Sequence, residues 1–329
     1  MLRVYVPALC AALLFQTPAT AQSVDVSQTV VQPVTELDPS VFPPPSRRQV
    51  LGYGRLTTND LIGDGKDRWR TGSITSSRVW GWGSWEGQAP TQFGDLLELR
   101  LQGEIMSPAD LRNVNPADRP WAGKLSFGLH THWTQGGTEF ALGGDLVVIG
   151  PHTHLDDFQK LLHDVVNAPT PSNAVLSQQI GNKIRPTFVG EVGKSYTMAD
   201  AMRLRPFAEA RAGDESLIRV GADLTIGHFG DGELMMRESI TGQRYRAVRD
   251  PIPGVSFILG ADIAKVFDST YLPEDRGYAL TDTRDRVRAG FHWQGEETSF
   301  FYGATWLGRE FQGQSDSQIV GSVRLQFQF

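Results

Sequence analysis

Long segments in which apolar and polar residues alternate constrain this chain more than any other feature of its sequence. In residues 317–329, Val323, Leu325 and Phe327 share one face, while Arg324 shares the other with glutamines. A period of two indicates a β-strand, because successive side chains of a strand point to opposite sides. The pattern recurs in segments of about 10 to 14 residues, whereas strands of soluble proteins usually have about 5 to 6. The chain is therefore predicted to be all-β, with long strands.

The charged residues of these segments recur on the polar face, so the two faces must meet different surroundings. A soluble sandwich or barrel also buries one face and exposes the other. The strand length favours a membrane barrel, in which tilted strands of about 9 to 11 residues separate lipid from a polar lumen. A chain that ends on the aromatic Phe329 also resembles outer-membrane proteins. The expected fold class is a closed antiparallel transmembrane β-barrel.

Counting the alternating segments predicts about twelve strands, an even number that suits a barrel with both chain ends in the periplasm. They are expected near residues 50–60, 70–82, 95–106, 121–134, 138–149, 183–194, 202–212, 216–228, 254–266, 284–294, 298–309 and 317–329. The connections after strands one, three and five then face outward, and the short turns at 195–201 and 294–297 face the periplasm. The arginine-rich connection 229–253 is long for a periplasmic turn.

One segment follows a different period. In residues 154–167, leucine, valine and phenylalanine recur at helical spacing, and Gln159 lies four residues before His163 on an adjoining face. Because this segment follows the fifth strand, a short helix is expected at the extracellular rim.

The amino-terminal residues predict export. Arg3, a short apolar run and small residues before Ala21 describe a secretory signal, so residues 1–21 are expected to be removed. The single cysteine, Cys10, would leave with them, and the mature barrel would contain no disulfide. Residues 22–48 are rich in Val, Gln, Pro and Ser and are expected to be an extended periplasmic segment, followed by the barrel at 49–329. The net charge of −6 argues against a nucleic-acid partner.

Several polar residues gather on the outward connections of this predicted barrel. Asn59 and Asp60 end the first strand, Asp67-Arg68 and Thr71 open the second, and Gln159 and His163 lie on the rim helix. Segments distant in sequence share one rim of a barrel, so these residues can form a single site. Each also has a simpler interpretation: Asn-Asp is common turn chemistry, Asp67-Arg68 resembles a surface ion pair, and a helix histidine is usually solvated or packed. His152-x-His154 is a weak metal signal.

The ordered motifs of the chain from about residue 50 onward resemble those of the lipid A 3-O-deacylases of bacterial outer membranes. The resemblance runs through Asn59-Asp60, Asp67-Arg68-x-x-Thr71, Glu104-Ile105-Met106-Ser107-Pro108, Asp118-Arg119-Pro120-Trp121-Ala122-Gly123, Leu142 to Pro151, Gln159, His163 and Gln179-Ile180-x-Asn182. The succession of these spacings is more specific than any single motif. It implies a twelve-stranded barrel that hydrolyses an acyl ester of lipid A with calcium, at a site beside a rim helix.

By this resemblance, His163 matches the catalytic base, and Asn59, Asp60, Thr71 and Gln159 match supporting positions. A neutral imidazole can take a proton from water near neutral pH. Asn59 and Asp60 offer the oxygen ligands that Ca²⁺ prefers, and a bound Ca²⁺ could polarise the ester carbonyl. The expected protein is a monomeric deacylase of the bacterial outer membrane, with lipopolysaccharide as substrate and a site that faces the extracellular leaflet.

The sequence departs from the family pattern at three places. Arg70 replaces an aromatic residue, Ser73 replaces a glycine, and the segment around Pro169 lacks an acidic residue expected shortly after the helix. Two other functions stay open at this point: a small transport or porin-like barrel whose lumen is lined by charged residues, and an inactive structural relative.

Overall fold

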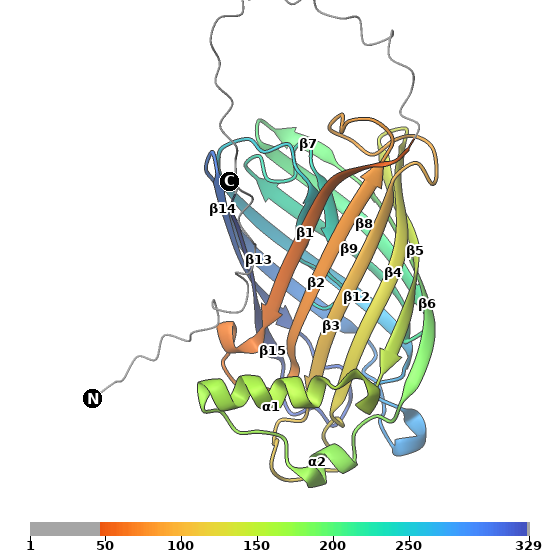
Figure 1. The fold of residues 1–329 in the computed structure, drawn as a ribbon, viewed down its shortest axis with the longest axis vertical. Coiled ribbons are helices and arrows are strands. Elements are labelled where there is room, and N and C mark those ends of the chain that lie inside the picture. Colours follow the sequence, from red (N-terminus) through yellow and green to blue (C-terminus); the bar gives the residue numbers. More distant parts are fainter. Residues whose placement is uncertain (1–46, 328–329) are drawn as a thin grey trace, which may run out of the picture.

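The computed structural model describes residues 47–327, which form a closed antiparallel β-barrel with short helices at one end (Figure 1). The predicted signal, residues 1–21, and nearly all of the predicted segment 22–48 lie outside the described residues. No helix within residues 47–327 is both long and apolar enough to cross a membrane.

Twelve long strands make the wall, and their bounds lie within three residues of those predicted. They are β1 Gln49–Asn59, β2 Trp69–Gly81, β3 Leu97–Ser107, β4 Ala122–Gln135, β5 Thr138–Ile149, β6 Lys183–Lys194, β8 Met202–Ala212, β9 Glu215–Ile226, β12 Gly254–Ser269, β13 Arg284–Gln294, β14 Thr298–Leu307 and β15 Gln318–Phe327. Each pairs with its neighbours in the order β6-β5-β4-β3-β2-β1-β15-β14-β13-β12-β9-β8, and a β6–β8 pairing closes the ring. The short β7, Tyr196–Ala199, pairs with the start of β8.

The alternation predicted from the sequence separates the outer face of the wall from the lumen. On β3, Leu99 and Leu101 point outward and are exposed, whereas Glu98 and Gln102 are buried inside. Arginines and carboxylates pair on the lumenal side of the wall: Arg286 Nε of β13 lies 2.8 Å from Asp262 Oδ1 on the neighbouring β12, and Arg237 NH2 lies 2.9 Å from Asp223 Oδ2. These buried charges are therefore neutralised by an ion-pair partner, as their removal from water requires.

The long connection 229–253 is not an open turn, because it folds back into the lumen. It contains a hairpin of β10, Leu234–Arg237, and β11, Arg244–Val248. The hairpin contacts separate parts of the wall: the Tyr245 hydroxyl lies 2.7 Å from Ser77 Oγ on β2, and Gln243 Nε2 donates to the Ala289 carbonyl on β13. It thus fills space that an open transport path would need.

The first strand is shared between the wall and this hairpin. Only three residues of β1, Thr57 to Asn59, pair with β15. Nearer its beginning, Gly52 and Gly54 lie against the backbone of β11, so closely that a Cβ on either would overlap the carbonyl oxygen of Ala247 or Arg246. Glycine is therefore required at both positions by close approach of two backbones.

The helices lie at the end of the barrel opposite β7, which we call the α1 end (Figure 1). They are α1 Leu155–Val166, α2 Asn173–Ser177 and the 3₁₀ turns η2 Asp60–Ile62, η3 Pro151–Thr153 and η4 Glu274–Arg276. The predicted helix 154–167 is thus confirmed. Its flanking residues His154 and Asn167 have φ of 53° and 58°, so the chain leaves the helical conformation at both ends. Asp156 and Asp157 in the first turn complement the positive end of the helix dipole.

Candidate active site

The helix α1 is held against the outer surface of the wall. Gly123 of β4 has the same outward orientation as the exposed Phe127 and Leu129, and a Cβ there would lie 2.5 Å from Thr153 Oγ1 and 3.0 Å from Leu155 Cβ. Beside it, the Trp121 indole donates to Gln159 Oε1 at 2.7 Å. A glycine and a tryptophan therefore dock the start of α1 and leave its buried face against the ends of the strands.

His163 lies on that buried face, with both ring nitrogens near polar partners. Nδ1 lies 2.6 Å from the Pro169 carbonyl oxygen, and Nε2 lies 3.3 Å from Asp67 Oδ2. Because a carbonyl oxygen can only accept, Nδ1 carries a proton and donates it to Pro169. The neutral ring then has its lone pair on Nε2, which points toward Asp67.

Asp67 reaches His163 from a tightly turned loop before β2. Its φ is 49°, and Trp69 follows with a φ of 54°. The pairing of β2 with β3 then skips one residue between Arg70 and Gly72, so Thr71 is the extra residue of a β-bulge. Bulges re-aim a side chain, and here the Thr71 hydroxyl points to Asp67 Oδ1 and lies 3.3 Å from Asp60 Oδ1. Thr71 thus joins two carboxylates beside the histidine.

Asp60 is fully buried behind Thr71. Its Oδ2 accepts the Arg68 backbone N–H at 2.6 Å and the Gln318 side-chain N–H at 3.3 Å. Burial raises the pKa of Asp60 to about 7; the bond from Arg68 opposes this shift, and the negative charges of Asp67 and Asp64 add to it. A buried carboxyl with a pKa perturbed in this way is a candidate functional group.

Two amide side chains among the predicted site residues, Asn59 and Gln159, differ in their hydrogen bonds. Asn59 Oδ1 accepts the Leu61 backbone N–H at 2.7 Å, so its side chain caps η2 as expected of turn chemistry. Gln159 is 2% exposed, and its Nε2 has no hydrogen-bond partner within residues 47–327. That amide is a buried donor available to a ligand.

The structure therefore brings four residues into one chain of contacts, His163, Asp67, Thr71 and Asp60, with Gln159 one helical turn from His163. Asp67 was not among the predicted site residues, and the surface-pair interpretation of Asp67-Arg68 is wrong. Asp67 faces His163, while the largely buried Arg68 lies 3.7 Å from both Asp64 and Asp316. The signal was the spacing Asp67-Arg68-x-x-Thr71, which places both Asp67 and Thr71 on the loop and bulge.

The donor set at Asp60 suits a hard cation. Asp60, Asp67 and Thr71 present carboxylate and hydroxyl oxygens to one region, and Ca²⁺ takes six to eight oxygen ligands. Across residues 47–327, no three His, Cys, Asp or Glu side chains converge as a metal-binding group. A Ca²⁺ ion here would therefore also need amide, backbone or water oxygens. His154, from the weak metal signal His152-x-His154, is not part of this group, because it lies on the surface near Asp157.

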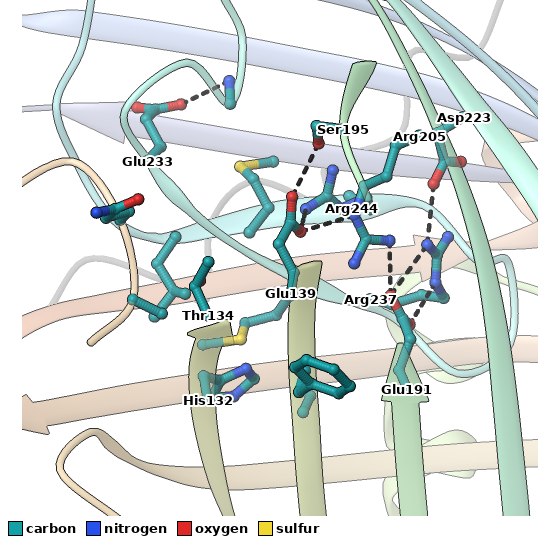
Figure 2. A pocket seen from close by; sticks show the side chains of 18 of the residues that line it. His132, Thr134, Glu139, Glu191, Ser195, Arg205, Asp223, Glu233, Arg237 and Arg244 are labelled. Atoms are coloured by element: carbon teal, nitrogen blue, oxygen red, sulfur yellow. Dashed lines mark hydrogen bonds and ion pairs between the residues drawn. The ribbon is translucent and has the colours of Figure 1, made fainter. Parts of the chain in front are cut away.

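A separate cavity of about 290 Å³ lies in the lumen toward the β7 end. Figure 2 shows Arg205 between Glu139 and Glu191, and Arg237 between Glu191 and Asp223. None of the predicted site residues lines it. The cavity and the His163 group are thus distinct parts of the molecule.

A model of the family described as "Outer membrane protein LpxR" matches residues 8–329. The chain belongs to the LpxR family. This is the lipid A 3-O-deacylase family that the sequence motifs resemble, and the chain is accordingly an outer-membrane lipid A deacylase. A search of curated protein sequences found no match.

Solved structures of outer-membrane barrels are similar to the chain. LpxR from Salmonella typhimurium has a TM-score of 0.69 at 18% identity, over 84% of this chain and 100% of that one. A KdgM porin has a TM-score of 0.37 at 7% identity, over 84% and 98%. The translocator domain of the autotransporter NalP from Neisseria meningitidis has a TM-score of 0.34 at 10% identity, over 84% and 87%. The first match confirms the predicted fold class.

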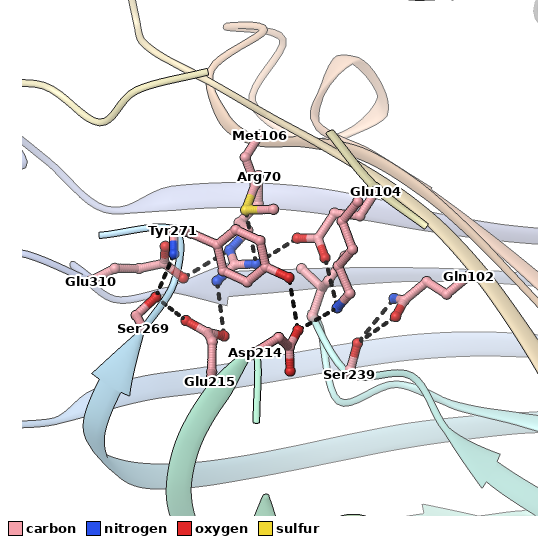
Figure 3. A network of polar contacts seen from close by, with 12 residues as sticks. Arg70, Gln102, Glu104, Met106, Asp214, Glu215, Ser239, Ser269, Tyr271 and Glu310 are labelled. Atoms are coloured by element: carbon pink, nitrogen blue, oxygen red, sulfur yellow. Dashed lines mark hydrogen bonds and ion pairs between the residues drawn. The ribbon is translucent and has the colours of Figure 1, made fainter. Parts of the chain in front are cut away.

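Two of the three departures from the LpxR-family pattern face the lumen. Arg70 lies among Glu104, Glu310 and Glu215 at 2.5, 2.9 and 3.4 Å, within the network shown in Figure 3. Ser73 pairs directly with Glu104 across the β2–β3 ladder, so it shares the lumenal side. Both changes therefore lie inside the wall, whereas α1 docks outside it.

The third departure is compensated by the backbone. The segment after α1 has no carboxylate, but its Pro169 carbonyl accepts the His163 Nδ1 proton at 2.6 Å. A carbonyl oxygen can fix the tautomer of a histidine as a carboxylate does.

Proposed function

We propose that this LpxR-family deacylase hydrolyses an acyl ester of lipid A with His163 as general base and Ca²⁺ bound beside Asp60. The observation that carries the proposal is the orientation of His163: Nδ1 donates to the Pro169 carbonyl, and Nε2 is directed at Asp67, which contacts Thr71. A histidine held in this tautomer can accept a proton from water at Nε2. No serine or cysteine nucleophile is then required.

Each neighbouring residue has a distinct task in this mechanism. The oxygen of a water molecule attacks the ester carbonyl as His163 Nε2 takes a proton from that water. Asp67 stabilises the imidazolium that forms. His163 then returns the proton to the sugar oxygen as the acyl carbon–oxygen bond breaks, which gives a fatty acid and a free hydroxyl. Gln159 Nε2 is a candidate donor to the developing oxyanion.

Asp60, Asp67 and Thr71, with Asn59 as a further predicted ligand, would hold the cation. When bound there, Ca²⁺ would supply positive charge that polarises the ester carbonyl. Because burial raises the pKa of Asp60 to about 7, this carboxyl would have to lose its proton before it could hold the cation.

The proposal places the α1 end at the extracellular leaflet. The first strand begins and the last strand ends at the β7 end (Figure 1), as expected for a barrel whose chain ends lie in the periplasm.

Mass spectrometry of lipid A tests this function. Lipid A from membranes that contain the protein should lose the mass of one ester-linked acyl chain, and membranes with His163→Ala should not. An unchanged lipid A profile with correctly assembled protein and added Ca²⁺ would refute the proposed reaction.

A further inference from the structure

The helix α1 has three faces with different surroundings. Gln159 and His163 are buried against the barrel, and Asp157, Lys160 and Asp164 form a charged face. Phe158, Leu161 and Val165 form a third face, and they are 43%, 61% and 70% exposed. These three residues lie at spacings of three and four, so they make one continuous apolar stripe.

The position of α1 brings this stripe next to the lipid-facing surface of the wall. The docking contact at Gly123 is on the outward face of β4, the face that carries the exposed Phe127 and Leu129. Leu155 packs with Ile105 and Trp121 at the same place. The helix therefore lies beside the wall rather than over the mouth of the lumen (Figure 1). Its exposed apolar stripe is thus on a helix that docks on the same outer face as Phe127 and Leu129.

We propose that the apolar stripe of α1 inserts into the hydrocarbon of the outer leaflet, so that α1 is an interfacial helix between the active site and the membrane. An amphipathic helix at a bilayer surface buries its apolar face at the headgroup boundary and keeps its charges in water. The charged face of Asp157, Lys160 and Asp164 meets the second requirement. The assignment of the stripe to the outer leaflet rests on the proposed function, which places the α1 end at that leaflet.

This placement has a consequence for the substrate. His163 and the stripe are on the same helix, so His163 would contact the reacting ester at the membrane depth of α1. The acyl chain of the substrate would then still lie among the acyl chains of the leaflet. The lipid A substrate would then reach His163 sideways within the leaflet, rather than after extraction into water.

Nitroxide labels measure the depth of each face without any need for activity. In a Cys10→Ala background, single cysteines replace Leu161 and Val165 on the stripe, and Asp157 and Asp164 on the charged face of the same helix. In vesicles of phospholipid and lipid A, labels at 161 and 165 should be reached by oxygen and protected from a water-soluble nickel chelate. Labels at 157 and 164 should show the opposite preference.

A second measurement tests the stripe in turnover. The double variant Leu161→Asp, Val165→Asp should lose about tenfold or more of deacylation in vesicles and stay within about twofold of wild type in mixed detergent micelles. The matched variant Asp157→Asn, Asp164→Asn should behave like wild type in both.

Equal exposure of all four labels to the nickel chelate would overturn the proposal, as would strong dipolar broadening between stripe labels, which would show that a second copy covers the stripe. Lipid-buried stripe labels in a protein with no deacylase activity would instead refute the proposed function and support the interfacial helix.

Discussion

The His163 imidazole donates from Nδ1 to the Pro169 carbonyl at 2.6 Å and presents Nε2 to Asp67 at 3.3 Å. The donor bond fixes the ring, and the opposite nitrogen is the one that can accept a proton. The position of a histidine six residues before a proline thus defines which atom acts as the base.

Replacement of His163 should abolish most of the activity. His163→Ala is expected to lower deacylation by about two to four orders of magnitude, the usual contribution of a positioned acid-base group. His163→Gln should be nearly as inactive, since an amide cannot take the proton from water. Turnover is measured on purified lipid A, with heat-modifiable migration on gels as the check of assembly.

The surface residue His152 is the control for His163. His152→Ala should retain wild-type turnover, because the hydrogen bond that His152 makes within residues 47–327 comes from its backbone N–H, which donates to Asn182 Oδ1. If His163→Ala assembles normally and keeps full activity, the general-base mechanism is wrong.

The activity should depend on the hydroxyl of Thr71 more than on the volume of its side chain. Thr71→Val keeps the shape but removes the donor shared by Asp67 and Asp60, and should lower activity about 10- to 100-fold, as loss of a group that orients ligands does. Thr71→Ser keeps the hydroxyl and should remain within a few-fold of wild type. Equal activities of the Val and Ser variants would contradict this role.

Calcium binding should weaken as the pH falls through the pKa of Asp60. The cation needs the carboxylate, and a proton competes for it below about pH 7, so affinity should drop about tenfold per pH unit there and level off above it. Calorimetric titration with Ca²⁺ at pH 6, 7 and 8 measures this effect.

Asp60→Asn is the matched variant for that titration. It should bind Ca²⁺ weakly and lose the pH dependence, while excess chelator should inactivate the wild type until Ca²⁺ is restored. Full activity of metal-free protein, or equal wild-type affinity at pH 6 and 8, would argue against a cation at Asp60.

The alternation of the strands could be predicted because every residue of the wall faces either lipid or lumen. Residues 183–194 and 284–294 were bounded correctly for this reason. The hairpin was not predicted, since Leu234–Arg237 and Arg244–Val248 are short and lie entirely inside the lumen, where apolar and charged residues mix on both faces.

The site was predictable to the extent that motifs were ordered along the chain. The resemblance supplied His163 and Gln159, and the helical spacing placed them on one segment. The contact of Asp67 with His163 depends on a left-handed backbone at residue 67 and a bulge at Thr71, neither of which has a periodicity that sequence could reveal.

A methyl group at Gly54 should disturb the barrel more than one at another strand glycine. Gly54→Ala would collide with the Arg246 carbonyl oxygen on β11, and overpacking of this kind costs about 1 to 3 kcal/mol. Gly144→Ala is the control, because the nearest atoms to its Cβ are 3.8 Å away. The temperature at which the heat-modifiable band shifts should fall for the first variant only.

The double contact of β1, with β15 over three residues and with β11 through Gly52 and Gly54, links two stages of biogenesis. In a cylinder without its hairpin, β1 would keep its pairing with β2 and only three residues of pairing with β15, and Asp223 would lack its partner Arg237. We therefore expect closure of the cylinder and packing of its interior to occur as one cooperative event.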